Sequence, residues 1–257
     1  MRNSATIRAW LIAVILLLGS GPTLAAGDLV LVAGATGRTG QQLVRELNAA
    51  GFTVRALVRD PASARKILGD GVEYATGDVR QRPTLDAALQ GARYAISAIG
   101  ATRKDPANSP EFVDFQGVQN LANAAAAAKI TQLVIVSSAG VTQKDHMLNK
   151  MFDNVLLWKA KGEAAVRASG VPYTIVRPGG LTDKPGGQSG VRLEQADRGT
   201  GLIPRADVAR VCVAALQSPE ARNRTFEVYS AQTPPNVDWS ALFGQLAADG
   251  SQPGVEP

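Results

Sequence analysis

Short apolar runs alternate with amphipathic stretches along most of the chain. Residues 29–33 are apolar at every position, which is typical of a strand buried on both faces of a parallel sheet. Residues 39–50 follow with apolar side chains at helical spacing and end at Gly51, a common helix stop. The same patterns predict further strands at 54–58, 72–76, 94–99, 132–137, 172–177 and 225–229, and further helices at 112–128, 155–169, 206–217 and 237–247.

Strands that alternate with helices predict the fold class. Such an order builds right-handed βαβ units, and these units assemble into a doubly wound parallel sheet with helices on both faces. No repeat and no linker divides the body, and 257 residues suit one large domain. We therefore expect a single α/β domain over residues 27–248, followed by a flexible Gly/Pro-rich tail over residues 249–257.

Residues 1–26 have a different character from the body. Arg2 and Arg8 bracket the basic start, ten apolar residues follow at 9–18, and the segment ends in small residues at Ala26. This order is typical of a secretory signal peptide, and the apolar run is shorter than the roughly 20 residues of a spanning helix. A cleaved leader predicts an exported or periplasmic protein. Two alternatives stay open: a retained N-terminal membrane anchor, or a start site near Ala26 and a cytoplasmic protein.

Composition and charge limit the classes of ligand that the protein is expected to bind. The chain has 27 Lys and Arg against 22 Asp and Glu, a net charge of +5, and without the two arginines of the leader the balance is 25 − 22 = +3. With no basic run interleaved with aromatics, we expect no nucleic acid. One His and one Cys supply neither a disulfide nor a Cys/His zinc site. We expect a small-molecule substrate and no metal, while the oligomeric state stays open.

A glycine-rich turn carries the strongest local signal. Residues 34–40 read Gly-Ala-Thr-Gly-Arg-Thr-Gly, between a buried strand and a helix, as a dinucleotide-binding turn requires. Gly34 makes the tight turn, Gly37 admits a pyrophosphate to the backbone, and Gly40 lets the helix pack closely. The helix N-terminus favours the anion. The expected cofactor-binding residues of this turn are Gly34, Thr36, Gly37, Arg38, Thr39 and Gly40.

The end of the second predicted strand separates the two nicotinamide cofactors. NAD-binding proteins usually carry an acidic residue there for the ribose hydroxyls, whereas this strand ends at Arg59. Its guanidinium can pair with a 2′-phosphate, and Arg38 offers a second positive charge. The alternative is that Arg59 is a solvated surface cation whose field is weakened by the neighbouring Asp60. The charges predict NADP, with NAD as the less favoured cofactor.

Taken together with six further segments, the glycine turn resembles that of the atypical short-chain dehydrogenase/reductases, in the NAD(P)-binding branch that includes NmrA-like proteins. The resemblance extends over residues 29–246 and implies a Rossmann-like single domain that binds NAD(P). The six segments are GDV at 77–79, VDFQG at 113–117, VSSAG at 136–140, WKAKGE at 158–163, YTIVRPGGL at 173–181 and PRADVA at 204–209.

The resemblance also implies roles for single residues. The implied contacts are adenine with Asp78 and the backbone of Val79, the middle of the cofactor with Ser97, Ala98 and Gly100, the nicotinamide end with Pro178, Gly179 and Leu181, and the nicotinamide ribose with Lys159. Each position also has a purely structural interpretation, for example Asp78 as a helix cap, Gly100 as a turn and Pro178 as the end of a strand.

A catalytic acid is harder to find. Many members of this superfamily place a Tyr four residues before a Lys, whose charge lowers the pKa of the Tyr. None of the four tyrosines stands in that spacing, and Val155 stands four residues before Lys159. Ser138 at the end of the fifth strand and Lys159 remain the catalytic candidates, with His146 as a weaker one. Ser138 is equally well explained as a strand-end serine bonded to backbone.

Two functions are therefore predicted. The first is an NADPH-dependent reductase of a small substrate that lacks the usual Tyr acid. The second is a non-catalytic NAD(P)H redox sensor or assembly factor, favoured by the missing Tyr. Cofactor binding is common to both predictions, and turnover would separate them.

Overall fold

The computed structural model describes residues 27–101, 106–235 and 237–250, so the predicted leader at 1–26 lies outside the described residues. Its centre is an eight-stranded sheet in the order β3-β2-β1-β4-β5-β6-β10-β8. The strands of this sheet are β1 (Leu29–Ala33), β2 (Thr53–Val58), β3 (Glu73–Thr76), β4 (Tyr94–Ser97), β5 (Gln132–Val136), β6 (Tyr173–Pro178), β8 (Val191–Glu194) and β10 (Arg224–Ser230).

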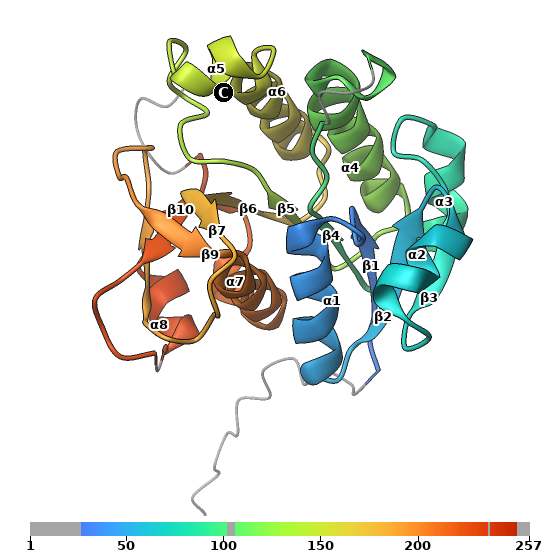
Figure 1. The fold of residues 1–257 in the computed structure, drawn as a ribbon, viewed down its shortest axis with the longest axis horizontal. Coiled ribbons are helices and arrows are strands. Elements are labelled where there is room, and N and C mark those ends of the chain that lie inside the picture. Colours follow the sequence, from blue (N-terminus) through green and yellow to red (C-terminus); the bar gives the residue numbers. More distant parts are fainter. Residues whose placement is uncertain (1–26, 102–105, 236, 251–257) are drawn as a thin grey trace, which may run out of the picture.

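Helices cover both faces of the sheet, with α1 and α7 side by side on the face turned to the viewer in Figure 1. The helices are α1 (Arg38–Ala49), α2 (Pro61–Leu68), α3 (Arg82–Leu89), α4 (Val118–Ala127), α5 (Met147–Met151), α6 (Val155–Ala168), α7 (Arg205–Gln217) and α8 (Trp239–Gly244). Shorter elements are the 3₁₀ turns η1 (Pro106–Asn108) and η3 (Pro219–Ala221), the π-helix η2 (Glu111–Gly117), and the paired strands β7 (Gly180–Thr182) and β9 (Leu202–Pro204).

The predicted fold class is confirmed. All seven predicted strands are present and run parallel, and β8 adds an antiparallel edge strand beside β10. The helix predicted at 112–128 begins as the π-helix η2 and continues as α4, and the one predicted at 237–247 is the shorter α8. Helices α2 and α3 were not predicted, because each has eight residues and too little apolar periodicity.

The two sides of β1 face two separate cores. Val30 and Val32 pack into the cluster that contains α1 and α7, whereas Leu31 and Ala33 pack into the cluster beneath α3, α4 and α6. Successive side chains of a strand point to opposite faces, so a strand between two helix layers must be apolar throughout. This double burial explains why the first strand was predicted so clearly from its sequence.

The ordered domain reaches beyond the predicted boundary at residue 248. The carboxylate of Asp249 accepts hydrogen bonds from the Tyr173 hydroxyl at 2.8 Å, the Thr225 backbone N–H at 3.0 Å and the Arg167 side chain at 3.3 Å. With the Thr225 hydroxyl, which donates at 2.6 Å, four hydrogen bonds hold this carboxylate. Residues 251–257 of the predicted flexible tail lie outside the described residues, and the tail stays a prediction.

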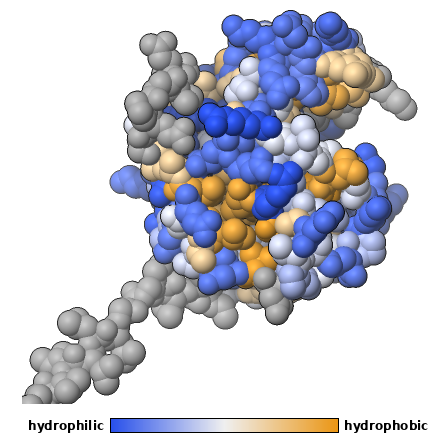
Figure 2. Space-filling view, turned by 90° about the vertical axis from the view of Figure 1, so that its left-hand side faces the viewer, coloured by the Kyte–Doolittle hydropathy of each residue, from blue (hydrophilic) through white to orange (hydrophobic). Residues whose placement is uncertain are grey.

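The described part of the chain contains no helix both long and apolar enough to cross a membrane. Figure 2 shows one face of the molecule, on which polar side chains predominate and hydrophobic side chains gather in patches between them.

Candidate functional site

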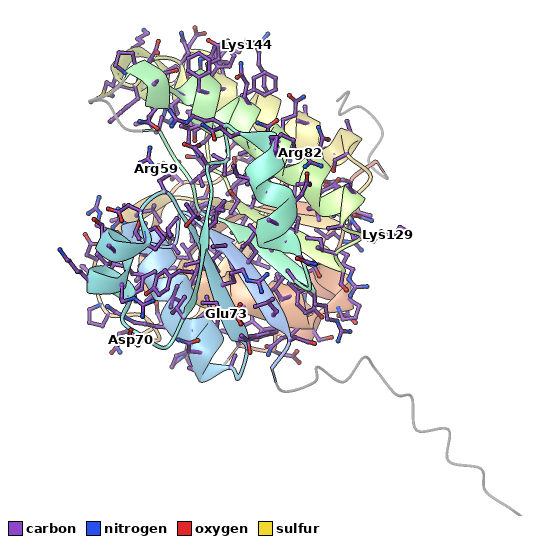
Figure 3. All side chains as sticks on the ribbon, turned by 90° about the vertical axis from the view of Figure 1, so that its right-hand side faces the viewer. Arg59, Asp70, Glu73, Arg82, Lys129 and Lys144 are labelled. Carbon is purple, nitrogen blue, oxygen red and sulfur yellow. The ribbon has the colours of Figure 1, made fainter. Side chains whose placement is uncertain are left out.

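The carboxyl edge of the parallel sheet holds a cavity of about 410 Å³. The ends of β1, β2, β3 and β4 meet here because neighbouring parallel strands end at one edge, the usual ligand position in such sheets. Figure 3 shows Arg59 at this edge, away from Asp70 and Glu73. The predicted site residues that line this cavity are Gly34, Thr36, Gly37, Arg59, Asp78, Val79, Ala98 and Gly100.

The glycine turn has the geometry that its spacing predicted. Gly34 adopts a φ of +81°, and a Cβ there would lie 2.6 Å from the carbonyl oxygen of Ala98. A Cβ at Gly40 would lie 2.1 Å from the carbonyl oxygen of Gly34, so only glycine lets α1 begin this close to the turn. Gly37 precedes the first turn of α1, and in the described residues no side chain caps this helix. Its first N–H groups can therefore receive an anion.

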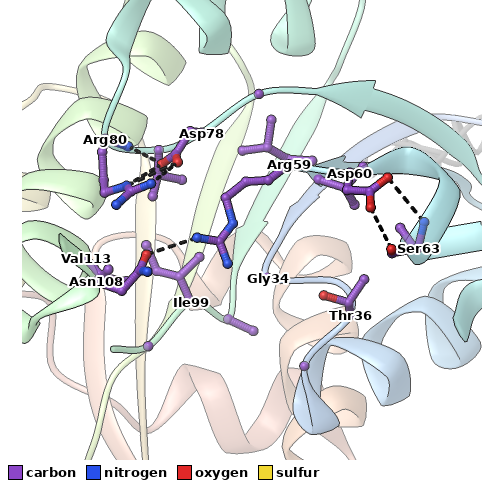
Figure 4. A pocket seen from close by; sticks show the side chains of 18 of the residues that line it. Gly34, Thr36, Arg59, Asp60, Ser63, Asp78, Arg80, Ile99, Asn108 and Val113 are labelled. Carbon is purple, nitrogen blue, oxygen red and sulfur yellow. Dashed lines mark hydrogen bonds and ion pairs between the residues drawn. The ribbon is translucent and has the colours of Figure 1, made fainter. Parts of the chain in front are cut away.

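Arg59 and Asp60 point in different directions from the end of β2 (Figure 4). Arg59 Nη1 donates to Asn108 Oδ1 at 3.0 Å from an exposed position on the cavity wall. The Asp60 carboxylate accepts from the backbone N–H groups of Ala62 at 2.9 Å and Ser63 at 3.3 Å and so caps α2. The Ser63 hydroxyl, which also donates to it, is the main cause that lowers the pKa of Asp60. The carboxylate is thus committed to α2 rather than to Arg59.

Asp78 is paired with an arginine two residues along the chain. Arg80 Nε lies 3.0 and 3.1 Å from its two carboxylate oxygens, and the Arg80 backbone N–H donates to Oδ1 at 2.9 Å. The Arg80 hydrogen bond holds the pKa of Asp78 below its usual range. Helix α3 begins after Gln81 rather than after Asp78, so the structural interpretation of Asp78 as that helix's cap is wrong. Its predicted contact with adenine stays a prediction.

Lys159 lies at a second, smaller cavity next to the ends of β4 and β5. Its Nζ is 2.6 Å from Asp114 Oδ1, and the Asp114 side chain is fully buried. Asp114 Oδ2 accepts the backbone N–H of Ala101 at 3.0 Å. The cavity measures about 10 Å³ and is also lined by the predicted site residue Ser97, by Ser137 and by Glu163.

A buried charge network continues from this cavity. The Ser137 hydroxyl donates to Glu163 Oε1 at 2.6 Å, and Arg177 bridges Glu163 at 2.7 Å and Glu227 at 3.0 Å. Burial raises the pKa of Glu227. Arg177 is 9% exposed and the two glutamates at most 1%, so three formal charges are held out of water by one another.

The remaining predicted residues line neither of these two cavities. They are Arg38, Thr39, Gly40, Ser138, Pro178, Gly179 and Leu181. Arg38 Nη1 makes an exposed ion pair with Asp183 Oδ2 at 2.9 Å, and Asp183 Oδ1 also pairs with Arg205 at 2.6 Å. Gly179 is a packing position, since a Cβ there would lie 2.4 Å from the carbonyl oxygen of Gly201.

The catalytic candidates have local partners. Ser138 Oγ donates to the Ala139 carbonyl at 2.9 Å, the strand-end backbone bond that the structural interpretation anticipated. His146 Nδ1 accepts the N–H of Leu148 at 3.1 Å and caps α5. Tyr229 packs near Gly179, but its hydroxyl donates to the Gly199 carbonyl at 2.8 Å and burial raises its pKa. In a Tyr–Lys pair the lysine lowers the pKa of the tyrosine, whereas the pKa of Tyr229 is raised.

Four partners of the predicted residues were missed from the sequence. They are Asn108 for Arg59, Arg80 for Asp78, Asp114 for Lys159, and Asp183 for Arg38. Only Arg80 is close to its partner in sequence. Asp114 lies within the segment 113–117 that carried part of the family resemblance, and this was the available signal for it.

The glycine turn, the uncapped helix and the cavity at the strand ends together define an NAD(P)-binding Rossmann-like domain. The sequence pattern of the NAD(P)H-binding family matches residues 34–219, and the chain belongs to this family. The predicted NAD(P)-binding resemblance is thereby confirmed, whereas the NmrA-like branch stays a prediction.

Known proteins similar to this chain include two plant relatives. An uncharacterised chloroplastic protein of Arabidopsis thaliana is 37% identical, over 84% of this chain and 75% of its own length. Sanguinarine reductase of Eschscholzia californica is 34% identical, over 84% of this chain and 95% of its own. Among solved structures, a Bacillus halodurans protein described as an NAD-dependent epimerase/dehydratase is 25% identical with a TM-score of 0.74, covering 86% of this chain and all of that one.

Proposed function

We propose that the protein binds NADPH and acts as a reductase of a small substrate. The observation that carries the cofactor preference is Arg59, whose guanidinium lines the cavity at the end of β2 while the Asp60 carboxylate caps α2. A cation at this position favours a 2′-phosphate, and an acid would favour the 2′-hydroxyl of NAD. The reductase name of the Eschscholzia relative supports the reaction class.

The residues of the chain fit a dinucleotide along one edge of the sheet. The first turn of α1 would hold the pyrophosphate, Arg59 the 2′-phosphate, and Asp78 with Val79 the adenine. Ser97, Ala98 and Gly100 would lie along the middle, and Pro178, Gly179 and Leu181 at the nicotinamide end. When bound, the cofactor supplies a hydride equivalent.

Lys159 is the proposed group at the nicotinamide ribose and the candidate source of positive charge near the reacting atoms. Ser138 follows β5, which lies between β4 and β6 in the sheet. Its hydroxyl would orient a substrate oxygen by turning away from the Ala139 carbonyl. No tyrosine provides a proton in this scheme, so the proton that accompanies reduction comes from Lys159 or from solvent.

Titration of NADPH and NADH by calorimetry tests the cofactor preference. Arg59→Glu removes a charge-assisted hydrogen bond worth about 1.5–3 kcal/mol, so NADPH affinity should fall about 10- to 100-fold while NADH affinity does not fall. The matched control is Arg82→Glu, the same charge reversal on α3. Equal losses for both cofactors, or no binding of NADPH to the unaltered protein, would contradict the proposal.

The second candidate function is a non-catalytic NAD(P)H sensor or assembly factor. Val155 stands four residues before Lys159 on α6, and the hydroxyls of Tyr74, Tyr173 and Tyr229 already donate to other groups. Oxidation of NADPH against a panel of carbonyls and quinones separates the two functions. Turnover that is lost in Lys159→Ala supports the reductase, and tight binding without turnover supports the sensor.

An exported or organellar location is proposed with this function. The basic, apolar and small-residue order of residues 1–26 supports a cleaved leader, and the Arabidopsis relative is itself named a chloroplastic protein. The N-terminal residue of the protein purified from its source tests this. A first residue at 26 or 27 supports cleavage, and an intact Met1 supports an anchor.

A further inference from the structure

We propose that Asp114 is the positioning residue for Lys159 and thereby fixes the nicotinamide half of the cofactor. The inference rests on the proposed function, because it assumes that Lys159 meets the nicotinamide ribose. It concerns the segment 113–117, which carried part of the family resemblance but has no role in the site as proposed so far.

The burial of Asp114 sets the first step of the argument. Its side chain has no exposed surface, and Oδ1 has no hydrogen-bond partner in the described residues apart from the ion pair with Lys159 at 2.6 Å. A carboxylate out of water is costly unless it is paired. The ammonium of Lys159 therefore offsets the free-energy cost of burying this carboxylate. The carboxylate in turn restricts where the ammonium lies.

Two unusual backbone features bring the pair together. Asp114 lies in η2, a π-helix of seven residues, and such wide turns are rare and recur at functional sites. Gly162 in α6 faces it, and a Cβ there would lie 2.3 Å from the Asp114 carbonyl oxygen. Only glycine lets α6 approach η2 this closely, and Lys159 stands one turn before Gly162 on the same helix.

The remaining contacts show what else Asp114 holds. Its Oδ2 accepts the backbone N–H of Ala101 at 3.0 Å, one residue after Gly100, which lines the larger cavity. Lys159 retains 17% exposure, so its ammonium also borders solvent. Asp114 therefore has two separable actions: it orients Lys159 at the nicotinamide end, and it anchors the backbone that follows Gly100 beside the larger cavity.

A comparison of two ligands separates these actions. NADPH contains the nicotinamide ribose, whereas adenosine 2′,5′-bisphosphate contains only the adenine end with its 2′-phosphate. Asp114→Asn should weaken NADPH about tenfold, the equivalent of one hydrogen bond to a charged group, and leave the bisphosphate unchanged. Glu111→Gln, which removes the same charge from the same helix, is the control and should change neither ligand.

Non-additivity supplies a readout that a merely structural role does not produce. If Asp114 acts through Lys159, the double variant Asp114→Asn/Lys159→Ala binds NADPH no more weakly than Lys159→Ala alone. Asp114→Glu keeps the carboxylate but displaces it, so its NADPH affinity should fall between those of the unaltered protein and Asp114→Asn. This variant carries the test if Asp114→Asn does not fold.

Three results would overturn the inference: unchanged NADPH affinity in Asp114→Asn, equal losses for both ligands, or additive losses in the double variant. Equal losses would mean that only the loop at Ala101 depends on Asp114. If the unaltered protein binds neither ligand, the proposed function fails and the inference fails with it. If the unaltered protein binds both ligands and any of the three results holds, the inference alone fails.

Discussion

The two ends of the proposed cofactor site are built in opposite ways. At the adenine end, backbone conformation and exposed charges shape an open cavity, with Gly34 at a positive φ and Arg59 on its wall. At the nicotinamide end, charges are buried and neutralise one another, as in the pairs Lys159–Asp114 and Arg177–Glu163. The first end therefore relies on glycine geometry and solvated charges, and the second on buried ion pairs.

The ion pairs at the two ends contribute differently to stability because they differ in their exposure to solvent. The Arg38–Asp183 pair leaves both side chains more than 60% exposed, and pairs of this kind contribute about 0–1 kcal/mol. A ligand phosphate can therefore recruit Arg38 at little cost. A buried pair behaves differently, because loss of one partner leaves the other charged and dry.

The largest effect is expected for Arg177→Met. This change leaves Glu227 buried without its cation and leaves Glu163 with Arg167 alone, at 3.2 Å, and breaking such a buried pair costs about 3–5 kcal/mol. Urea unfolding measures it. Arg82→Met, which breaks the more exposed pair with Asp86 on α3, should cost less than about 1 kcal/mol. Equal costs for the two variants would mean that burial does not determine the cost of losing an ion pair.

Gly40→Ala should have the next largest effect. Its Cβ would be placed 2.1 Å from the Gly34 carbonyl oxygen, so the start of α1 must shift away from the turn. Overpacking of this kind costs about 1–3 kcal/mol, and NADPH affinity should fall as the turn distorts. Gly244→Ala is the control, because nothing lies within 4 Å of a Cβ there. Unchanged melting and binding in Gly40→Ala would show that the turn does not depend on glycine at 40.

The smallest effect is expected for Asp78→Asn and depends on pH. The Arg80 hydrogen bond lowers the pKa of Asp78 from its ordinary value of 3.8, so folding favours the ionised carboxylate. The stabilisation, about 1 kcal/mol or less for this partly exposed pair, is present above pH 3.8 and is lost as the pH falls through the lower, folded value. Urea unfolding of both proteins between pH 2 and pH 7 checks this. A difference that grows toward low pH would contradict it.

The features that could be predicted from the sequence also differ between the adenine end and the nicotinamide end. The glycine turn, the parallel strands and Arg59 depend on residues close together in the chain, so spacing and periodicity predicted them. Asp114 and Lys159 are 45 residues apart, and Asp183 and Arg38 are 145 apart. No local pattern joins such residues, because the π-helix and the close approach at Gly162 that unite the first pair exist only after folding.

Two details were inaccessible for a further reason. The contact of Arg59 with Asn108 depends on η1, whose last residue lines the cavity, and the burial of Glu227 depends on the neighbouring strand β6 that carries Arg177. A charged residue in a strand is predicted to lie at the surface when its partners on the neighbouring strands are unknown. The pairing of β6 with β10 turns Arg177 and Glu227 into partners and reverses that interpretation.

Hydrogen–deuterium exchange with bound ligand tests the central claim, that one extended dinucleotide joins the two ends. With NADPH, protection should increase at the glycine turn over residues 34–41 and also at 97–101 and 111–117, beside Lys159 and Asp114. With adenosine 2′,5′-bisphosphate, only the adenine end should gain protection. Protection confined to residues 34–41 with both ligands, or protection with neither, would contradict the account.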